Sequence, residues 1–366
     1  MEWLAKRFEL SRAQGAPGMR PMEGLRGLAV FLVFLVHYLT LARPWLGAGA
    51  APAFADAVHT IGNSGVDLFF VLSGYLIYGS LMRRPQPYLR FLARRVERIY
   101  PVFLLVFALY LALSLLLPAQ SKIPQAPLEA TLYLVQNLLL LPGLFPIEPM
   151  IAVAWSLSYE VLYYIALPAL IGVARLRGRS ALWRVCFFVG AAGAALLLGL
   201  RWGGPVRLAM FVAGILLHEA LAGRARPPGA AIALPALALA WLALLSPLAG
   251  AGKAALLGAA FFLLCWACFG RPAGVLARAF SWTPLRWLGN MSYSFYLLHG
   301  LALKAMFALV AALVPAVAHG APPLALLLLA PMLLACLLAA GCVFVLVERP
   351  CSLDRSTPAT LICRRQ

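Results

Sequence analysis

Apolar residues occur in long runs along this chain, and the short segments between the runs carry most of the charged side chains. Each run is roughly twenty residues long, the length that an α-helix needs to cross the hydrocarbon core of a bilayer. The pattern predicts ten transmembrane helices, over residues 25–42, 62–82, 99–118, 151–172, 183–200, 205–221, 229–248, 252–269, 287–310 and 323–347. We therefore expect an all-α, polytopic membrane protein with both termini on one side of the membrane.

One connection is much longer than the others and covers residues 119–150. It contains the apolar piece YLVQNLLLLPGLF, which is too short to cross a bilayer and is interrupted by Pro142 and Gly143. We expect a re-entrant or interfacial segment near residues 131–143.

The whole chain divides into a transmembrane domain over residues 25–350, with residues 1–24 before it and a tail, residues 351–366, after it. Residues 1–24 lack the apolar core and the cleavage site of a signal peptide, so we expect the first span to remain as an anchor.

Basic residues provide an independent test of the topology. If the N-terminus is cytoplasmic, 23 of the 30 Lys and Arg residues fall in inner segments and only 5 in outer segments. Short cytoplasmic loops are enriched in Lys and Arg, so this bias predicts that the N-terminal segment and the tail are both cytoplasmic.

Composition supports the same class, because 63% of the residues are hydrophobic and only 11% are charged. The inner loops and anionic lipid headgroups explain the net charge of +18. No basic stripe with interleaved aromatic residues indicates a nucleic-acid partner. Cys265 and Cys268 have no second pair with which to complete a zinc site, so we expect no metal.

Two ionisable residues inside the first predicted span, Arg26 and His37, lie on one face of the helix. Eleven residues make three turns plus about 20°, with a rise of roughly 16 Å. A guanidinium at the cytoplasmic end suits a ligand that carries phosphate, and a neutral imidazole deeper in the bilayer suits proton removal near neutral pH. The alternative for His37 alone is a hydrogen bond to a neighbouring helix.

Two further sets of charged residues lie near these depths. Asp67, near the outer end of the second span, can accept a hydrogen bond from His37 and fix its tautomer. Alternatively, Asp67 is a helix N-terminal carboxylate that the helix dipole stabilises. Arg95 and Arg98 are three residues apart beside the third span, a spacing that suits two adjacent phosphates; ordinary positive-inside charge is the alternative.

The fourth and ninth spans carry polar residues within AWSLSYEVLYY and NMSYSFYLLHG. Glu160 has no basic neighbour in the sequence, and Ser158 and Tyr163 flank it. We expect Glu160 to support the reacting groups or to bind the acceptor; pairing with an arginine from another span is the alternative. Tyr296 and His299 are at helical spacing, and His299 is either a second site histidine or one satisfied between helices.

Six segments in this order resemble the integral-membrane acyltransferase-3 family: EGLRGLAVFLVFLVHY, GVDLFFVLSGYLI, RRVERIYP, WSLSYE, SYSFYLLH and VERP. The resemblance extends from Glu23 to Pro350. It implies a ten-span enzyme that transfers acyl groups from cytoplasmic acyl-CoA to acceptors, often glycans, at the outer face.

The resemblance also implies residue roles. The pair Arg26 and His37 is required for activity in the family, and the pair at Arg95 and Arg98 is thought to bind the donor. Ser158 and Glu160 match a further functional element. We therefore expect an O-acyltransferase with acetyl-CoA as donor. His37 is the expected general base, and Asp67 or Glu160 is the residue that orients it. The residues expected to bind the donor are Arg26, Arg95 and Arg98, and those expected to bind the acceptor are Ser158, Tyr163, Tyr296 and His299. An acyl-histidine intermediate is the alternative to general-base catalysis.

The same interpretation predicts the acceptor, the location and the partners of this protein. We expect an extracytoplasmic glycan or glycolipid acceptor, contact with membrane lipids, and a location in the bacterial inner membrane. Many relatives carry an appended esterase-like domain; this sequence has none, which implies direct transfer or a separate partner. A transporter for an acidic solute, or acylation of a lipid or a secondary metabolite, would be the other interpretations of the same residues.

Overall fold

The computed structural model describes residues 2–10, 19–47, 49–202, 206–313 and 322–353 of the 366-residue chain. Within these ranges the regular secondary structure is helical, which confirms the predicted all-α class. Residues 354–366, the larger part of the predicted cytoplasmic tail, lie outside the described residues. The chain divides into two compact units, and the helices α7, α14 and α15 contribute residues to both.

The first unit is built from residues within 1–85, 170–292 and 303–334. Its helices are α1 (Glu2–Phe8), α2 (Met19–Ala42), α3 (Ala50–Gly62), α4 (Ser64–Arg83), α8 (Ala181–Trp202), α9 (Ala209–Ala222), α10 (Ala230–Leu245), α11 (Gly250–Gly270), α12 (Val275–Phe280) and α13 (Thr283–Asn290), with parts of α14 (Ser292–Leu313) and α15 (Pro322–Val343). In this unit α2 packs against α3, α4, α12 and α13, and α4 packs against α9.

The contact between α2 and α13 is close because glycines face the neighbouring backbone. A Cβ atom on Gly27 would meet the carbonyl oxygen of Leu285, and one on Gly289 would meet the carbonyl oxygen of Glu23. Small residues allow this approach between helices that have no hydrophobic driving force in lipid. The N-terminal half of α2 is thereby held in a fixed position on α13.

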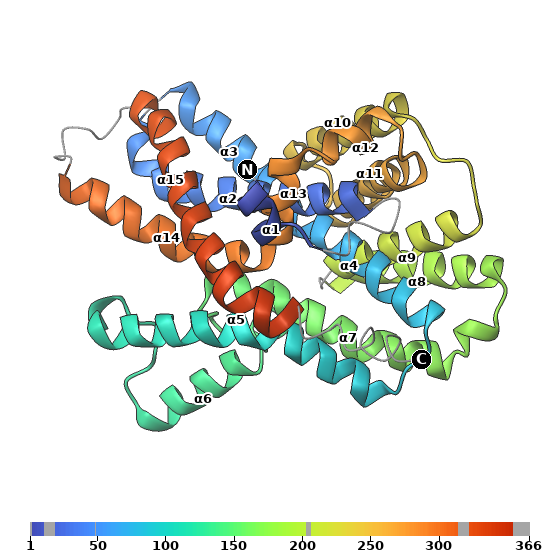
Figure 1. Ribbon diagram of the computed structural model, residues 1–366, viewed down its shortest axis with the longest axis horizontal. Coiled ribbons are helices and arrows are strands. Elements are labelled where there is room, and N and C mark those ends of the chain that lie inside the picture. The colour runs from blue at the N-terminus through green and yellow to red at the C-terminus, as the bar shows by residue number, and fades with distance from the viewer. Residues whose placement is uncertain (1, 11–18, 48, 203–205, 314–321, 354–366) are drawn as a thin grey trace. The chain divides into compact units, whose positions relative to one another are not determined.

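The second unit is built from residues within 86–169, 293–302 and 335–366. It contains α5 (Tyr88–Leu116), α6 (Pro127–Leu138), most of α7 (Trp155–Val173), the N-terminal part of α14, the end of α15 and a π-helical segment, Phe344–Leu353. The π-helical segment packs against α5. Figure 1 shows α5, α6 and α7 in cyan to green and the π-helical segment in red.

The segment predicted near residues 131–143 folds as α6 followed by a tight turn. Leu140 and Gly143 adopt positive φ angles of 55° and 96°, which end the helix and reverse the chain. The Tyr100 hydroxyl donates to the carbonyl of Leu138 at 3.1 Å, so the end of α6 lies beside the middle of α5 (Figure 1). A re-entrant or interfacial location for this segment stays a prediction.

Eight helical stretches within the described residues are long and apolar enough to cross a membrane. Each of the ten predicted spans overlaps helical residues, but α9 and α10 have only 14 and 16 residues. Such lengths fall below the roughly 17 residues that a span needs. The structure therefore supports a multi-pass membrane protein, and among the described residues α10 is an apolar helix that is shorter than a span.

Two boundaries differ from the predicted ones in ways that matter for the site. Helix α5 begins at Tyr88 rather than near residue 99, because the amphipathic basic segment is helical and continuous with the apolar span. The ninth predicted span, 287–310, is broken at Met291, where α13 ends and a new helix begins at Ser292. Apolar run length alone marks neither boundary.

Candidate active site

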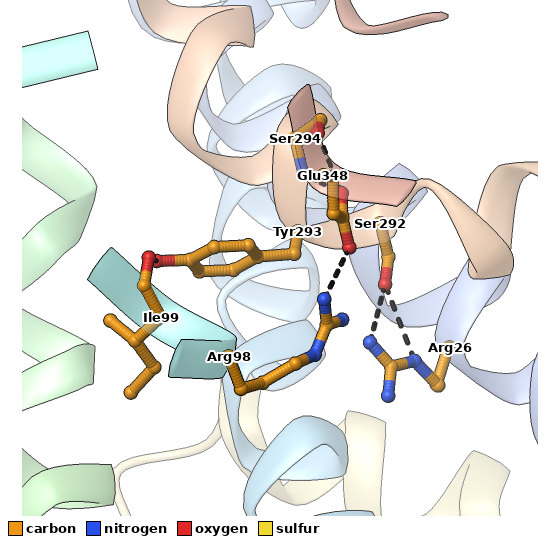
Figure 2. Close-up of polar contacts among 7 residues, drawn as sticks. All are labelled: Arg26, Arg98, Ile99, Ser292, Tyr293, Ser294 and Glu348. Carbon is orange, nitrogen blue, oxygen red and sulfur yellow. Dashed lines mark hydrogen bonds and ion pairs between the residues drawn. The ribbon is translucent and has the colours of Figure 1, made fainter. Parts of the chain in front are cut away.

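Helix α2 is continuous from Met19 to Ala42 and carries both Arg26 and His37. The expected separation of roughly 16 Å along one helix therefore holds. The guanidinium of Arg26 donates to the Ser292 hydroxyl from Nη2 at 2.9 Å and from Nε at 3.3 Å (Figure 2). Ser292 is buried at the first position of α14 and thus fixes the orientation of Arg26.

A buried ion pair fixes the start of the same helix. The carboxylate of Glu23 accepts from Nε of Arg286 at 2.9 Å, and both side chains are buried. The same guanidinium lies 3.3 Å from the carboxylate of Glu9. In the sequence, Arg286 falls in a predicted inner loop, and its partners are 263 and 277 positions away in the chain, so local patterns indicate only positive-inside charge.

His37 lies half-buried on α2, and the next residue anchors this part of the helix. The buried Tyr38 hydroxyl donates to the carbonyl of Ala325 on α15. The side chains of His59 and Lys304 lie near enough to interact electrostatically with His37. His37 therefore lies in the C-terminal half of α2, within electrostatic range of two ionisable side chains.

Asp67 is buried near the start of α4, as the sequence indicated, and has a basic neighbour that the sequence did not identify. Nε of Arg207 lies 3.5 Å from Oδ1 of Asp67. This ion pair gives the carboxylate a structural reason to be there. An interaction between Asp67 and His37 stays a prediction.

In the second unit, Arg98 forms an ion pair with Glu348, a residue to which the sequence pattern assigns no role. Its Nη1 lies 2.7 Å from Oε1 of Glu348, which is fully buried in the π-helical segment (Figure 2). The guanidinium of Arg98 also lies over the Tyr293 ring, 5.5 Å from its centroid. The signal in the sequence was the closing VERP, which the resemblance included without a function.

Arg95 lies on the same face of α5, between two aromatic rings. Its guanidinium carbon is 5.1 Å from the centroid of Phe91 and 5.6 Å from that of Tyr164. Its Nε is buried without a hydrogen-bond partner. The Tyr164 hydroxyl donates to Glu160 at 2.6 Å, and both Arg95 and Arg98 interact electrostatically with Tyr164. The second unit therefore brings Glu160 close to the two arginines.

The predicted acceptor residues Ser158, Tyr163, Tyr296 and His299 are all buried. Ser158 donates to the carbonyl of Pro142, and this bond ties the turn after α6 to α7. The Tyr296 hydroxyl lies 2.7 Å from the Ser156 hydroxyl and donates to the carbonyl of Val153 at 3.0 Å. Ser156 is a partner that the sequence pattern does not indicate.

The His299 imidazole lies within hydrogen-bonding distance of a backbone carbonyl in the preceding turn of the same helix. Its Nδ1 is 3.0 Å from the carbonyl oxygen of Phe295, and its ring stacks on the Phe295 ring. These contacts agree with a histidine held inside the helix bundle, and a role in acceptor binding stays a prediction. No group of three His, Cys, Asp or Glu residues that could hold a metal ion occurs in the part of the chain that the structure describes.

Comparisons with known proteins agree with the motifs. Residues 21–344 match the family described as "Acyltransferase domain". The chain is 30% identical over 260 residues to "Exopolysaccharide production protein ExoZ" from Rhizobium meliloti (strain 1021), over 67% of this chain and 78% of that protein. It is 27% identical over 360 residues to "Acyltransferase MdmB" from Streptomyces mycarofaciens, over 90% of each chain.

A third relative is longer. The chain is 25% identical over 320 residues to "O-acetyltransferase OatA" from Staphylococcus aureus (strain NCTC 8325 / PS 47), over 76% of this chain and 49% of that protein. No solved structure matches the chain. The family match and the apolar helices together show that the chain belongs to the acyltransferase-3 family and is a multi-pass membrane O-acyltransferase.

Proposed function

We propose that this protein transfers an acetyl group from cytoplasmic acetyl-CoA to a hydroxyl of an extracytoplasmic glycan, from a position in the bacterial inner membrane. The observation that carries the proposal is the continuous helix α2, which holds Arg26 and His37 on one face. The names of two relatives, an exopolysaccharide production protein and an O-acetyltransferase, support a glycan acceptor and an acetyl donor.

The donor binds through its phosphates to Arg26, Arg95 and Arg98. Arginine suits this role because its planar fork binds phosphate with two parallel hydrogen bonds. The ring contacts of Arg95 and the hydrogen bonds of Arg26 keep both guanidinium groups ordered before the donor arrives. An extended pantetheine arm covers the roughly 16 Å rise between Arg26 and His37.

His37 acts as general base. It removes the proton of the acceptor hydroxyl while the oxygen attacks the thioester carbonyl. The C–S bond then breaks, and the departing coenzyme A thiolate takes up the proton from the His37 imidazolium, which returns the histidine to its neutral form. Asp67, which lies in the same unit, orients the imidazole. The bond from Tyr164 favours a role for Glu160 beside the donor arginines.

The acceptor reaches His37 from the outer side. The residues proposed to bind its sugar are Ser158, Tyr163, Tyr296 and His299, whose hydroxyl and imidazole groups can provide the hydrogen bonds that a sugar needs. Transfer is direct or uses a separate extracytoplasmic partner.

The proposal is tested with isotopically labelled acetyl-CoA supplied to the cytoplasmic face of membrane vesicles that contain the protein. We expect label in the glycan on the opposite face, and no transfer in vesicles without the protein. Substrate-dependent flux of an acidic solute without acyl transfer would contradict the proposal and favour a transporter.

A further inference from the structure

Glu348 is a fully buried carboxylate in the π-helical segment, and the proposed reaction gives it no role. A buried charge is costly unless partners satisfy it. Three donors reach this one: Nη1 of Arg98 at 2.7 Å, the backbone N–H of Ser294 at 3.1 Å and the Ser294 hydroxyl at 2.6 Å (Figure 2). π-Helical turns are rare and occur frequently at functional sites.

The two carboxylate oxygens of Glu348 have different partners. Oε2 accepts both bonds from Ser294, and Oε1 accepts the bond from Arg98. Ser294 lies in the first turn of α14, where backbone N–H groups have no partner inside the helix. The helix terminus therefore fixes Oε2, and the carboxylate presents Oε1 to Arg98 from a fixed position.

Arg98 is constrained from a second side and is still accessible. The ring of Tyr293 lies under its guanidinium, and the Tyr293 hydroxyl donates to the carbonyl of Ile99 at 2.7 Å, which fixes the ring (Figure 2). The Arg98 side chain is 21% exposed, whereas Glu348 is not exposed. A guanidinium has five N–H donors, so one edge can bind Glu348 while the others bind a second anion.

We propose that Glu348 is a positioning residue for Arg98: it holds the guanidinium in the orientation that binds a phosphate of the acyl donor. This inference rests on the proposed function, which places Arg98 at the donor. It adds that the C-terminal π-helical segment is part of the donor site, acting through Arg98.

The first test is Glu348→Gln in the full-length protein, with coenzyme A as the probe in isothermal titration calorimetry. An amide has one acceptor oxygen, whereas Glu348 uses two, so the glutamine cannot satisfy both Arg98 and Ser294. Its oxygen faces the Ser294 donors, and its NH₂ group faces Arg98, which loses its anchor. We expect coenzyme A to bind about tenfold more weakly, the typical loss of one charge-assisted hydrogen bond.

Two controls separate positioning from a general structural role. Glu97→Gln removes an exposed carboxylate from the residue before Arg98, and we expect unchanged affinity. The second control adds Glu348→Gln to Arg98→Lys. Lysine cannot bind two anions at once in a fixed geometry, so it has no orientation for Glu348 to maintain. The double variant should therefore bind coenzyme A less than about twofold more weakly than Arg98→Lys alone. All titrations are made below the unfolding temperature of the variants, so a loss of stability does not alter the measured affinity.

The outcomes distinguish the two proposals. If Arg98→Lys binds coenzyme A as tightly as the natural protein, the assignment of Arg98 to the donor is wrong. If Arg98→Lys weakens binding but Glu348→Gln binds equally or more tightly, only the positioning role is wrong. Should Glu348→Gln fail to fold, Ser294→Ala keeps the buried charge and its pairing with Arg98. It should weaken binding in the same direction, by about threefold, and unchanged affinity there would overturn the inference.

Discussion

Arg26 and Ser292 are joined by two hydrogen bonds between residues that are 266 positions apart in the chain. The serine hydroxyl accepts from both Nη2 and Nε, so it fixes the plane of the guanidinium. Arg26 is therefore ordered before a donor arrives, and the start of α14 is part of the proposed donor site.

Replacing Ser292 with alanine removes the acceptor of Arg26 and leaves its charge in place. We expect the apparent KM for acetyl-CoA to rise about tenfold with little change in kcat, because a hydrogen bond to a charged group is lost. Ser292→Thr should restore most of the loss, since it retains the hydroxyl. A fall in kcat at unchanged KM would contradict a role in donor binding.

Adding a methyl group to Gly289 should separate α13 from α2. The new Cβ would meet the carbonyl oxygen of Glu23, so the helices must move apart. We expect Gly289→Ala to destabilise the protein by about 1–3 kcal/mol, the usual cost of overpacking. The measurement is the thermal unfolding midpoint in detergent.

Gly300 provides the matched control for this substitution. It also lies in a helix, and a Cβ atom there has no neighbour within 4 Å. Gly300→Ala should leave the midpoint unchanged or raise it slightly, because alanine favours helices more than glycine does. Equal midpoints for the two variants would show that the contact between α2 and α13 is not close.

Replacing Arg286 with methionine should leave Glu23 buried without its cation. The expected loss of stability is about 3–5 kcal/mol, because an unpaired buried charge is costly. Adding Glu23→Gln to Arg286→Met should recover a large part of that loss, since the amide is neutral. If the double variant is no more stable than Arg286→Met, charge burial does not explain the loss.

The apolar helices and the motif residues could be predicted from the sequence, but the hydrogen-bond and ion-pair partners of the motif residues could not. Helix α2 and the face shared by Arg26 and His37 follow from local periodicity. Ser292 and Glu348 are far from Arg26 and Arg98 in the chain, and only tertiary structure brings each pair together.

Helix α3 and the break at Met291 show why the sequence pattern did not predict every helix boundary. Helix α3, over Ala50–Gly62, was not predicted, because it is short and precedes the apolar run of α4. The break at Met291 was hidden inside a continuous apolar pattern, although it creates the helix start that carries Ser292. Apolar run length reports membrane crossing and does not report where one helix ends and the next begins.

Asp67 forms an ion pair with Arg207 and is proposed to orient His37. The variants Asp67→Asn and Arg207→Gln separate these two roles. If Asp67 orients His37, Asp67→Asn should lower kcat at least a hundredfold, because the wrong tautomer is then favoured. Arg207→Gln should lower kcat far less. Equal losses in the two variants would assign Asp67 to the ion pair with Arg207 alone.

In the proposed reaction, His37 removes the proton of the acceptor hydroxyl. The most direct test measures transfer of label from acetyl-CoA to cell-surface glycan in vesicles with equal amounts of natural protein, His37→Ala, or His59→Ala, which replaces a nearby histidine on α3. We predict that His37→Ala inserts normally and has no detectable transfer, whereas His59→Ala keeps transfer within about twofold of the natural rate. Normal turnover by a correctly inserted His37→Ala protein would contradict the account.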